Sequence, residues 1–236
     1  MDWFGFVDIY CERTAPGFWN EPLNALSNLS FIAAAVWAWV EMDRRRLENL
    51  ALRAAIALAF SIGVGSFLFH TFAQQWSALA DVIPIWTFVA YFVLLAIRHF
   101  GDVQPGRVAM IAAATIAVIA VVFWITSGSN VRTDNLSDAG PGPLNGSEQY
   151  APALVALYVF VGVAWWRKLD VRGWIAAAAV AFTLSLGFRT VDQMVCAALP
   201  FGTHFLWHLL NGAMIAILLQ AMLRRLDNAR NAVAGG

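Results

Sequence analysis

Two histidines near the end of the chain, His204 and His208, are four residues apart. On a helix this spacing places both imidazoles on one face, where they can share a metal ion. His70 lies in a different apolar segment and can supply a third nitrogen. Three protein ligands with one open position are typical of catalytic zinc, whereas structural zinc usually takes four ligands. The three histidines therefore predict a catalytic type of zinc site.

Other interpretations of the histidines stay open. A single histidine in a membrane helix is more often a hydrogen-bond partner for another helix than a metal ligand. Haem would more naturally use opposed histidines on facing helices, and iron or another divalent ion is compatible with the spacing. The fourth histidine, His99, follows Arg98 and is expected at a solvated helix end.

Ser66 and Asp81 are the side chains expected beside the metal. Ser66 precedes His70 by four residues and shares its helix face, while Asp81 follows it by eleven residues across a short turn. Serine is common where membrane helices pack closely, so Ser66 alone is weak support. Asp81 has a competing role as the buried partner of Arg189. Arg189 and Asp192, at i and i+3, offer a further pair, for which we favour a structural role.

The composition indicates that lipid is the main solvent of the chain. Of its 236 residues, 60% are hydrophobic and 13% are charged, and the mean hydropathy is +0.65. A soluble domain carries about 25% charged residues, so the composition argues against an ordinary water-soluble protein. The formal net charge is zero, which argues against nucleic acid as a partner.

Seven apolar segments are long enough to cross a ~30 Å hydrocarbon layer as helices. The longest polar break between them runs from 127 to 147. We therefore predict an all-α, polytopic membrane protein with seven transmembrane helices, in which residues 1–236 form a single domain. The seven segments are 24–42, 50–73, 77–98, 106–127, 149–166, 173–194 and 202–223.

Basic residues predict the orientation of these helices. The loops on one side hold twelve Lys and Arg and those on the other side hold two, with Arg189 inside the sixth segment. Cytoplasmic loops are enriched in basic residues, so the N-terminus is expected outside and the C-terminus in the cytoplasm. The first residues lack the basic start and long apolar core of a signal peptide, so we expect them in the mature protein. The twelve are Arg44, Arg45, Arg46, Arg53, Arg98, Arg107, Arg167, Lys168, Arg172, Arg224, Arg225 and Arg230, and the two are Arg13 and Arg132.

This topology brings the ionisable groups of the membrane segments to one depth. The second segment ends just after His70, and the third begins just before Asp81. The sixth ends at Asp192, and the seventh begins near His204, while Glu21 heads the first. Such groups cost about 2.5 to 3.5 kcal/mol each on insertion scales and are usually functional. We therefore expect the reaction centre in the outer third of the bundle.

The order of these residues resembles that of the alkaline ceramidases. The pattern is Ser66-x-x-x-His70, then Asp81, then His204-x-x-x-His208, on seven helices with the N-terminus outside. The alkaline ceramidases belong to a wider superfamily of seven-helix membrane hydrolases that includes the adiponectin receptors. The resemblance covers essentially the whole chain. It implies a zinc amidase that cuts ceramide into sphingosine and a fatty acid, with the three histidines as ligands, Asp81 orienting or deprotonating the zinc-bound water and Ser66 assisting the carbonyl oxygen.

The N-terminal segment carries a second, partial resemblance. Eukaryotic members have Asp-Trp-Cys-Glu-x-Asn followed by Glu-Phe-Trp-Asn-x-x-Ser-Asn, which together hold calcium. The stretch from Glu21 to Asn28 matches the second half, but Asp8 is one residue further from the cysteine, Thr14 replaces an asparagine and the connection is shorter. The resemblance implies a calcium site with Asp8, Glu12 and Glu21 as ligands, and calcium favours such oxygen donors. A solvated acidic arm is the alternative.

Cys11 and Cys196 are the only cysteines, and the predicted topology puts both outside. An oxidising exterior permits a bond between them, and the resemblance points to the same disulfide. Two unrelated thiols are the alternative.

The chemistry also favours hydrolysis on physical grounds. Zinc supplies hydroxide at neutral pH and polarises a carbonyl, and Asp81 can act as general base and then acid. A membrane lipid amide near the outer interface fits this position better than a soluble peptide, and a monomer is compatible with the sequence.

The alternatives to this function are a receptor or scaffold with a structural metal, a hydrolase of another membrane lipid, and a transporter or proton relay. The last needs polar residues deeper in the membrane, and 112–122 and 153–163 have almost none. The Ala- and Arg-rich composition points to a bacterial plasma membrane, with the site toward the outer side.

Overall fold

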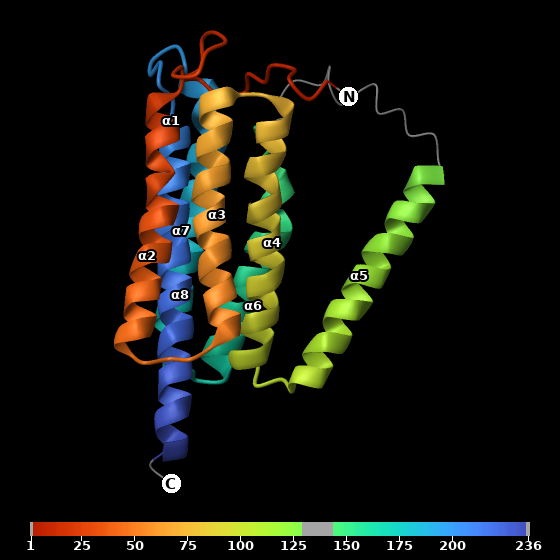
Figure 1. The fold of residues 1–236 in the computed structure, drawn as a ribbon, viewed down its shortest axis with the longest axis vertical. Helices are drawn as coiled ribbons and strands as arrows, with labels where there is room; N and C mark the ends of the chain where they lie inside the picture. The colour runs from red at the N-terminus through yellow and green to blue at the C-terminus, as the bar shows by residue number, and fades with distance from the viewer. Residues whose placement is uncertain (1, 129–143, 235–236) are drawn as a thin grey trace.

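The computed structural model describes residues 2–128 and 144–234, and this part of the chain is helical, with no strand. The expected all-α fold is confirmed. Figure 1 shows a bundle of long, roughly parallel or antiparallel helices. The helices are α1 (Pro22–Ser27), α2 (Leu29–Arg44), α3 (Leu50–Phe72), α4 (Gln75–His99), α5 (Pro105–Gly128), the 3-10 helix η2 (Ser147–Tyr150), α6 (Ala151–Trp166), α7 (Arg172–Val195) and α8 (His204–Ala234).

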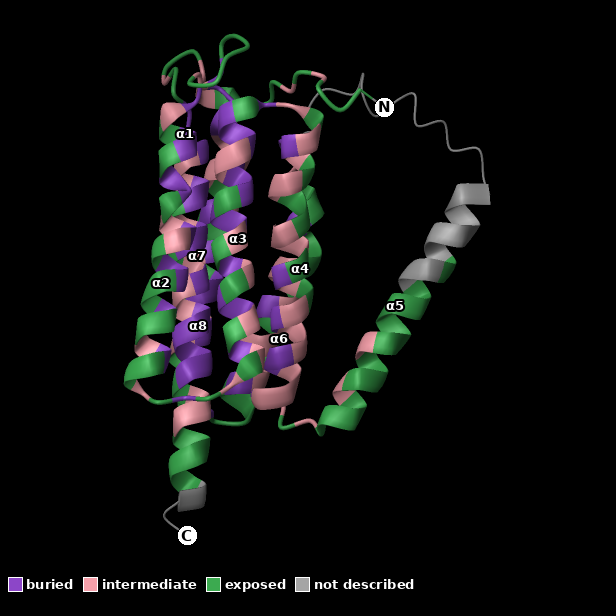
Figure 2. Cartoon of the chain, viewed as in Figure 1, coloured by how far each residue is buried: buried purple, intermediate pink, exposed green. Residues whose placement is uncertain are grey.

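Helix α8 lies at the centre of the packing. It contacts α2 and α7 extensively, α3 packs against α2 and α4, and α6 packs against α7. Within the described residues, α5 contacts only α4, and Figure 1 shows it leaning away from the bundle. Figure 2 shows that buried residues concentrate on α3, α7 and α8, so these helices carry most of the core.

The helices have the length and composition to cross a membrane. Six spans in the described part meet this criterion, with α1 and α2 together forming the first, and the apolar stretch Pro105–Val118 of α5 is shorter. The expected segments agree closely with the helices, except that α8 continues to Ala234 rather than ending near 223. The extension contains no helix breaker and forms an i, i+3 ion pair between Asp227 and Arg230 (2.6 Å). The polar loop containing Arg132 lies mostly outside the described residues.

A short turn with strong local signals joins α3 to α4. Ala73 ends α3 in the left-handed conformation, with φ 47°. Gln74 and Ser77 then form reciprocal side-chain and backbone hydrogen bonds at the start of α4. The N-terminal residues lie antiparallel to this turn, where the Val7 amide donates to the Ala73 carbonyl (2.9 Å) and the Gln75 amide donates to the Gly5 carbonyl (3.1 Å).

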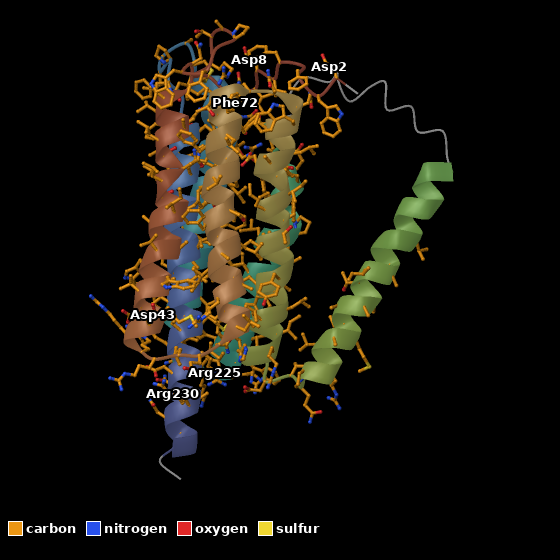
Figure 3. All side chains as sticks on the ribbon, in the orientation of Figure 1. Asp2, Asp8, Asp43, Phe72, Arg225 and Arg230 are labelled. Atoms are coloured by element: carbon orange, nitrogen blue, oxygen red, sulfur yellow. A yellow bond between two sulfur atoms is a disulfide. The ribbon has the colours of Figure 1, made fainter. Side chains whose placement is uncertain are left out.

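The two ends of the bundle differ in charge. We call the end where residues 2–20 lie the arm end, and the opposite end, where the C-terminus lies, the basic end. In Figure 3, Asp2, Asp8 and Phe72 lie at the arm end, whereas Arg225 and Arg230 lie at the basic end. This distribution is the one on which the predicted orientation rests, and the placement of the basic end in the cytoplasm stays a prediction.

Candidate active site

The structure brings the three histidines together at the arm end. His70 lies in the last turn of α3, His204 is the first residue of α8, and His208 follows one turn later. One ring nitrogen from each histidine lies within 4.8 Å of those of the other two, and all three side chains are buried. This group can hold a metal ion. It is the only group of three or more His, Cys, Asp and Glu ligands found within residues 2–128 and 144–234.

The hydrogen bonds of the histidines fit metal binding. His70 Nδ1 lies 2.6 Å from Glu21 Oε2, and His208 Nδ1 lies 2.7 Å from Ser27 Oγ. In the described part of the chain, His70 Nε2 and His204 Nδ1 are buried without a hydrogen-bond partner. A ligating histidine usually has its second ring nitrogen held by a carboxylate or another polar group. The residues present therefore fit a bound metal ion, with Glu21 and Ser27 orienting two of the rings.

His204 is held by Tyr10, which was not among the predicted site residues. The Tyr10 ring stacks on the His204 ring, with centroids 3.6 Å apart. Arg189 Nη1 donates a hydrogen bond to the Tyr10 hydroxyl (2.8 Å), and its guanidinium also lies over Tyr150 and Trp207. Burial raises the pKa of Tyr10, so the hydroxyl stays protonated at neutral pH. The only sequence signal for Tyr10 is its position beside Cys11.

Asp192 fixes the start of α8. Its fully buried carboxylate accepts hydrogen bonds from the backbone amides of Cys11 (3.1 Å), Thr203 (2.7 Å) and His204 (2.9 Å). A carboxylate at a helix N-terminus is favourable because the free amides there carry partial positive charge. Gly202 allows this approach, since its φ is 61° and a Cβ there would overlap the Asp192 carboxylate.

The expected Arg189–Asp192 ion pair is wrong, and so is the alternative pair with Asp81. Among the described residues, Arg189 forms no ion pair with either carboxylate. Their i, i+3 spacing makes the two side chains neighbours on the surface of α7. Asp192 nevertheless binds backbone amides, and Arg189 binds Tyr10. The structural role favoured for both residues agrees with these contacts.

Cys11 and Cys196 form a disulfide bond, as the resemblance implied. The bond links the N-terminal arm to the residues that follow α7. Because Cys11 lies between Tyr10 and Glu12, it holds the arm beside His204 and α1.

Ser66 and Asp81 lie where α3 and α4 touch. A Cβ at Gly65 would overlap the Ala80 carbonyl oxygen and lie 3.4 Å from the Asp81 Cα. The glycine therefore allows the two backbones to approach directly beside Ser66 and Asp81. Ser66 is buried, whereas Asp81 is partly exposed; Asp81 Oδ1 is buried and has no hydrogen-bond partner among the described residues. This oxygen is therefore free to accept a hydrogen bond.

The carboxylates expected to bind calcium have other partners. Glu12 accepts hydrogen bonds from the Leu23 (2.7 Å) and Asn24 (2.8 Å) amides and so caps α1. Burial raises the pKa of Glu12 despite these two bonds. Burial also acts to raise the pKa of Glu21, but the charge of His70 and hydrogen bonds from His70, Asn24 and Arg13 hold it below its ordinary value. Asp8 is exposed.

A guanidinium lies among the oxygen atoms of this region. The Arg13 side chain is fully buried and pairs with Glu21. It also donates to the carbonyls of Ala15 (3.4 Å), Gly17 (3.0 Å) and His70 (3.1 Å). Asp8, Glu12 and Glu21 do not form one of the ligand groups found in the described residues. The geometry therefore fits the fixed charge of Arg13 better than a calcium ion.

An apolar cavity begins at the histidine group. Ser66 and His208 line it at the arm end, and Phe92, Ala96 and Phe100 line it toward the basic end. Between Ile85 and Ala96 the cavity wall follows about 16 Å of α4, at 1.5 Å per residue. Such a cavity can hold a lipid chain with its polar group at the histidines.

The chain matches the model of a known protein family. The ceramidase family model matches residues 10–136, which is more than half of the chain. The match includes Ser66, His70 and Asp81, whereas His204 and His208 lie beyond it. No curated protein matches the sequence.

Proposed function

Because the chain belongs to the ceramidase family, we propose that it hydrolyses the N-acyl bond of ceramide at a zinc ion held by His70, His204 and His208. Family membership supports ceramide hydrolysis in general. The observation that carries the finer proposal is that His208, one of the three clustered histidines, also lines the apolar cavity, together with Ser66. A lipid can therefore place its amide at the histidines while a chain lies in the cavity.

We propose specific roles for the side chains around the amide. Zinc, when bound, lowers the pKa of a coordinated water to near 7 and polarises the carbonyl. Asp81 takes a proton from the attacking water and then delivers it to the leaving amine. Ser66 donates a hydrogen bond to the carbonyl oxygen as negative charge develops there. The water oxygen bonds to the acyl carbon, the C–N bond breaks, and a fatty acid and sphingosine are released.

Residues that do not touch the substrate position this machinery. Glu21 orients His70, Ser27 orients His208, and Asp192 fixes the first turn of α8 on which His204 lies. The outer position of the arm end, a bacterial plasma membrane and a single domain over 1–236 are part of the same proposal.

Purified protein tests the proposal with two variants. His204→Ala is expected to lose bound zinc and ceramide hydrolysis together. Asp81→Asn is expected to keep zinc and the fold but to release fatty acid at least about 100-fold more slowly, because the general base is lost. Metal analysis and mass spectrometry of the released lipid measure both effects.

Three results would contradict parts of the proposal. Full activity in Asp81→Asn would remove that residue from the mechanism. Bound metal without turnover across ceramides and other N-acyl lipids would favour a receptor or scaffold. Turnover of a different membrane lipid alone would keep the hydrolase but change its substrate.

A further inference from the structure

Asn211 is a polar side chain in the apolar cavity that the proposed mechanism does not use. It follows His208 by three residues on α8, so it lies on the same helix face, one turn closer to the basic end. Its side chain is buried, with 5% of the residue exposed. It lines the same cavity as Ser66 and His208.

Only one end of the Asn211 amide has a partner. Ser185 Oγ donates to the Phe182 carbonyl (2.7 Å) and shares the same hydrogen with Asn211 Oδ1 (3.3 Å). Asn211 Nδ2 is buried without a hydrogen-bond partner in the part of the chain that the structure describes. Burying an amide N–H without an acceptor is unfavourable, so most buried donors in proteins are paired. An acceptor from outside the protein can satisfy this one.

The surroundings of Asn211 indicate where such an acceptor comes from. The cavity wall beyond it, toward the basic end, is apolar and includes Met214, Ile215 and Leu218. The rise from His208 to Asn211 is about 4.5 Å. A lipid chain that runs from the histidines into the cavity therefore passes Asn211 within a few bonds of its amide.

We propose that Asn211 Nδ2 donates a hydrogen bond to a hydroxyl group of the lipid, close to the scissile amide. This inference rests on the proposed function and adds a second substrate group, a hydroxyl, that the site recognises besides the amide. The hydroxyl is either that on C3 of the long-chain base or one on C2 of the acyl chain. A site that hydrogen-bonds a substrate hydroxyl discriminates strongly against the analogue that lacks it, because its own polar group is then left unpaired.

Kinetics with three lipids test the inference and identify the hydroxyl. The substrates are ceramide, its analogue without the C3 hydroxyl, and ceramide with a 2-hydroxy acyl chain. In wild-type protein we expect a difference of at least about tenfold in kcat/KM in one of two comparisons. Either ceramide is cleaved better than its analogue without the C3 hydroxyl, or the ceramide with a 2-hydroxy acyl chain is cleaved better than ceramide. Asn211→Leu keeps the size of the side chain but removes the donor, and we expect it to abolish most of that preference.

Two further variants separate recognition from structure. Met214→Leu changes an apolar residue one turn further along the same wall and is expected to keep the preference. Ser185→Ala removes the hydrogen bond to Asn211 Oδ1. If Asn211 has only a structural role, Ser185→Ala and Asn211→Leu should each lower kcat/KM for all three lipids by a common factor. Thermal unfolding and zinc content of each variant check the fold.

The outcomes decide the inference even if a variant does not fold. Equal kcat/KM for all three lipids in wild-type protein would overturn it. An unchanged preference in folded Asn211→Leu would overturn it as well. If wild-type protein cleaves none of the three lipids, the proposed function fails instead. Native mass spectrometry of the intact lipids bound to wild-type protein then tests the inference, and equal retention with and without the hydroxyl would overturn it.

Discussion

The two ends of the bundle hold their charged side chains in different ways. At the arm end, Asp192 and Glu21 are buried, and their oxygens bind backbone amides, Arg13, Asn24 and a histidine. At the basic end, the Asp102 side chain is 51% exposed while it pairs with Arg167 and Arg225. Water screens the exposed ion pairs of the basic end, but it does not reach the buried contacts of the arm end. The charges of the arm end therefore fix geometry, whereas those of the basic end contribute little to it.

The N-terminal arm takes part in this fixed geometry. It supplies Tyr10 to the His204 ring, Arg13 to Glu21 and the His70 carbonyl, and Cys11 to the disulfide. We therefore expect changes in the arm end to affect stability and zinc binding together. Matching changes at the basic end are expected to affect neither.

The largest effect is expected from Asp192→Ala. It leaves the amides of Cys11, Thr203 and His204 without their acceptor. Hydrogen bonds to a charged group contribute about 1.5 to 3 kcal/mol each, so we expect a loss of at least about 3 kcal/mol in the free energy of unfolding. Denaturant titration in detergent micelles measures this loss.

Asp102→Ala is the matched control at the basic end. Its pairs with Arg167 and Arg225 are partly exposed, so the expected loss is below about 1 kcal/mol. Equal losses in the two variants would remove the contrast between the ends.

A somewhat smaller effect is expected from breaking the disulfide. The double variant Cys11→Ser, Cys196→Ser removes a link between residues 185 positions apart. Removal of a native disulfide typically costs about 2 to 4 kcal/mol, and here it also frees the arm that carries Tyr10. We expect lower thermal stability and weaker zinc retention under chelator challenge. A reducing agent should reproduce the effect in wild-type protein and change nothing further in the variant, and unchanged zinc retention would separate the arm from the metal site.

The contact between α3 and α4 gives a third prediction. Gly65→Ala forces the backbones apart because the new Cβ overlaps the Ala80 carbonyl. Overpacking of this kind costs about 1 to 3 kcal/mol, and the shift also moves Ser66 relative to Asp81. We expect reduced stability and a larger fall in kcat than in zinc content. Gly187→Ala is the control, because a Cβ there meets nothing within 4 Å, and an equal effect in both variants would contradict the role of the contact.

These features show what the sequence could and could not predict. Apolar length and turn residues were sufficient for the helices, because a backbone in lipid must satisfy its own hydrogen bonds. The i, i+4 spacing of His204 and His208 placed them on one face of α8. Gly65 had a usable signal, since small residues mark close contacts between membrane helices, and it stands beside Ser66.

Contacts made by the arm had no such signal. The stacking of Tyr10 on His204 depends on the path of an irregular segment, which no periodicity describes. The i, i+3 rule suggested the Arg189–Asp192 pair, but that rule applies to neighbouring side chains on a helix surface. A buried carboxylate is better satisfied by several amides, and the free amides at the start of α8 were closer partners for Asp192.

The smallest expected effect concerns calcium, where the resemblance and the geometry diverge. Because Arg13 already places a positive charge against Glu21, we expect calcium chloride at up to about 1 mM, the range of weak calcium modules, to change neither thermal stability nor ceramide hydrolysis. Magnesium chloride at the same concentration controls for ionic strength, and metal analysis should find no bound calcium. Arg13→Gln keeps a hydrogen-bond donor but leaves the buried Glu21 carboxylate without its cation, so it should lower the thermal stability. A calcium-dependent rise in the unfolding temperature of wild-type protein would show that Arg13 does not replace the ion.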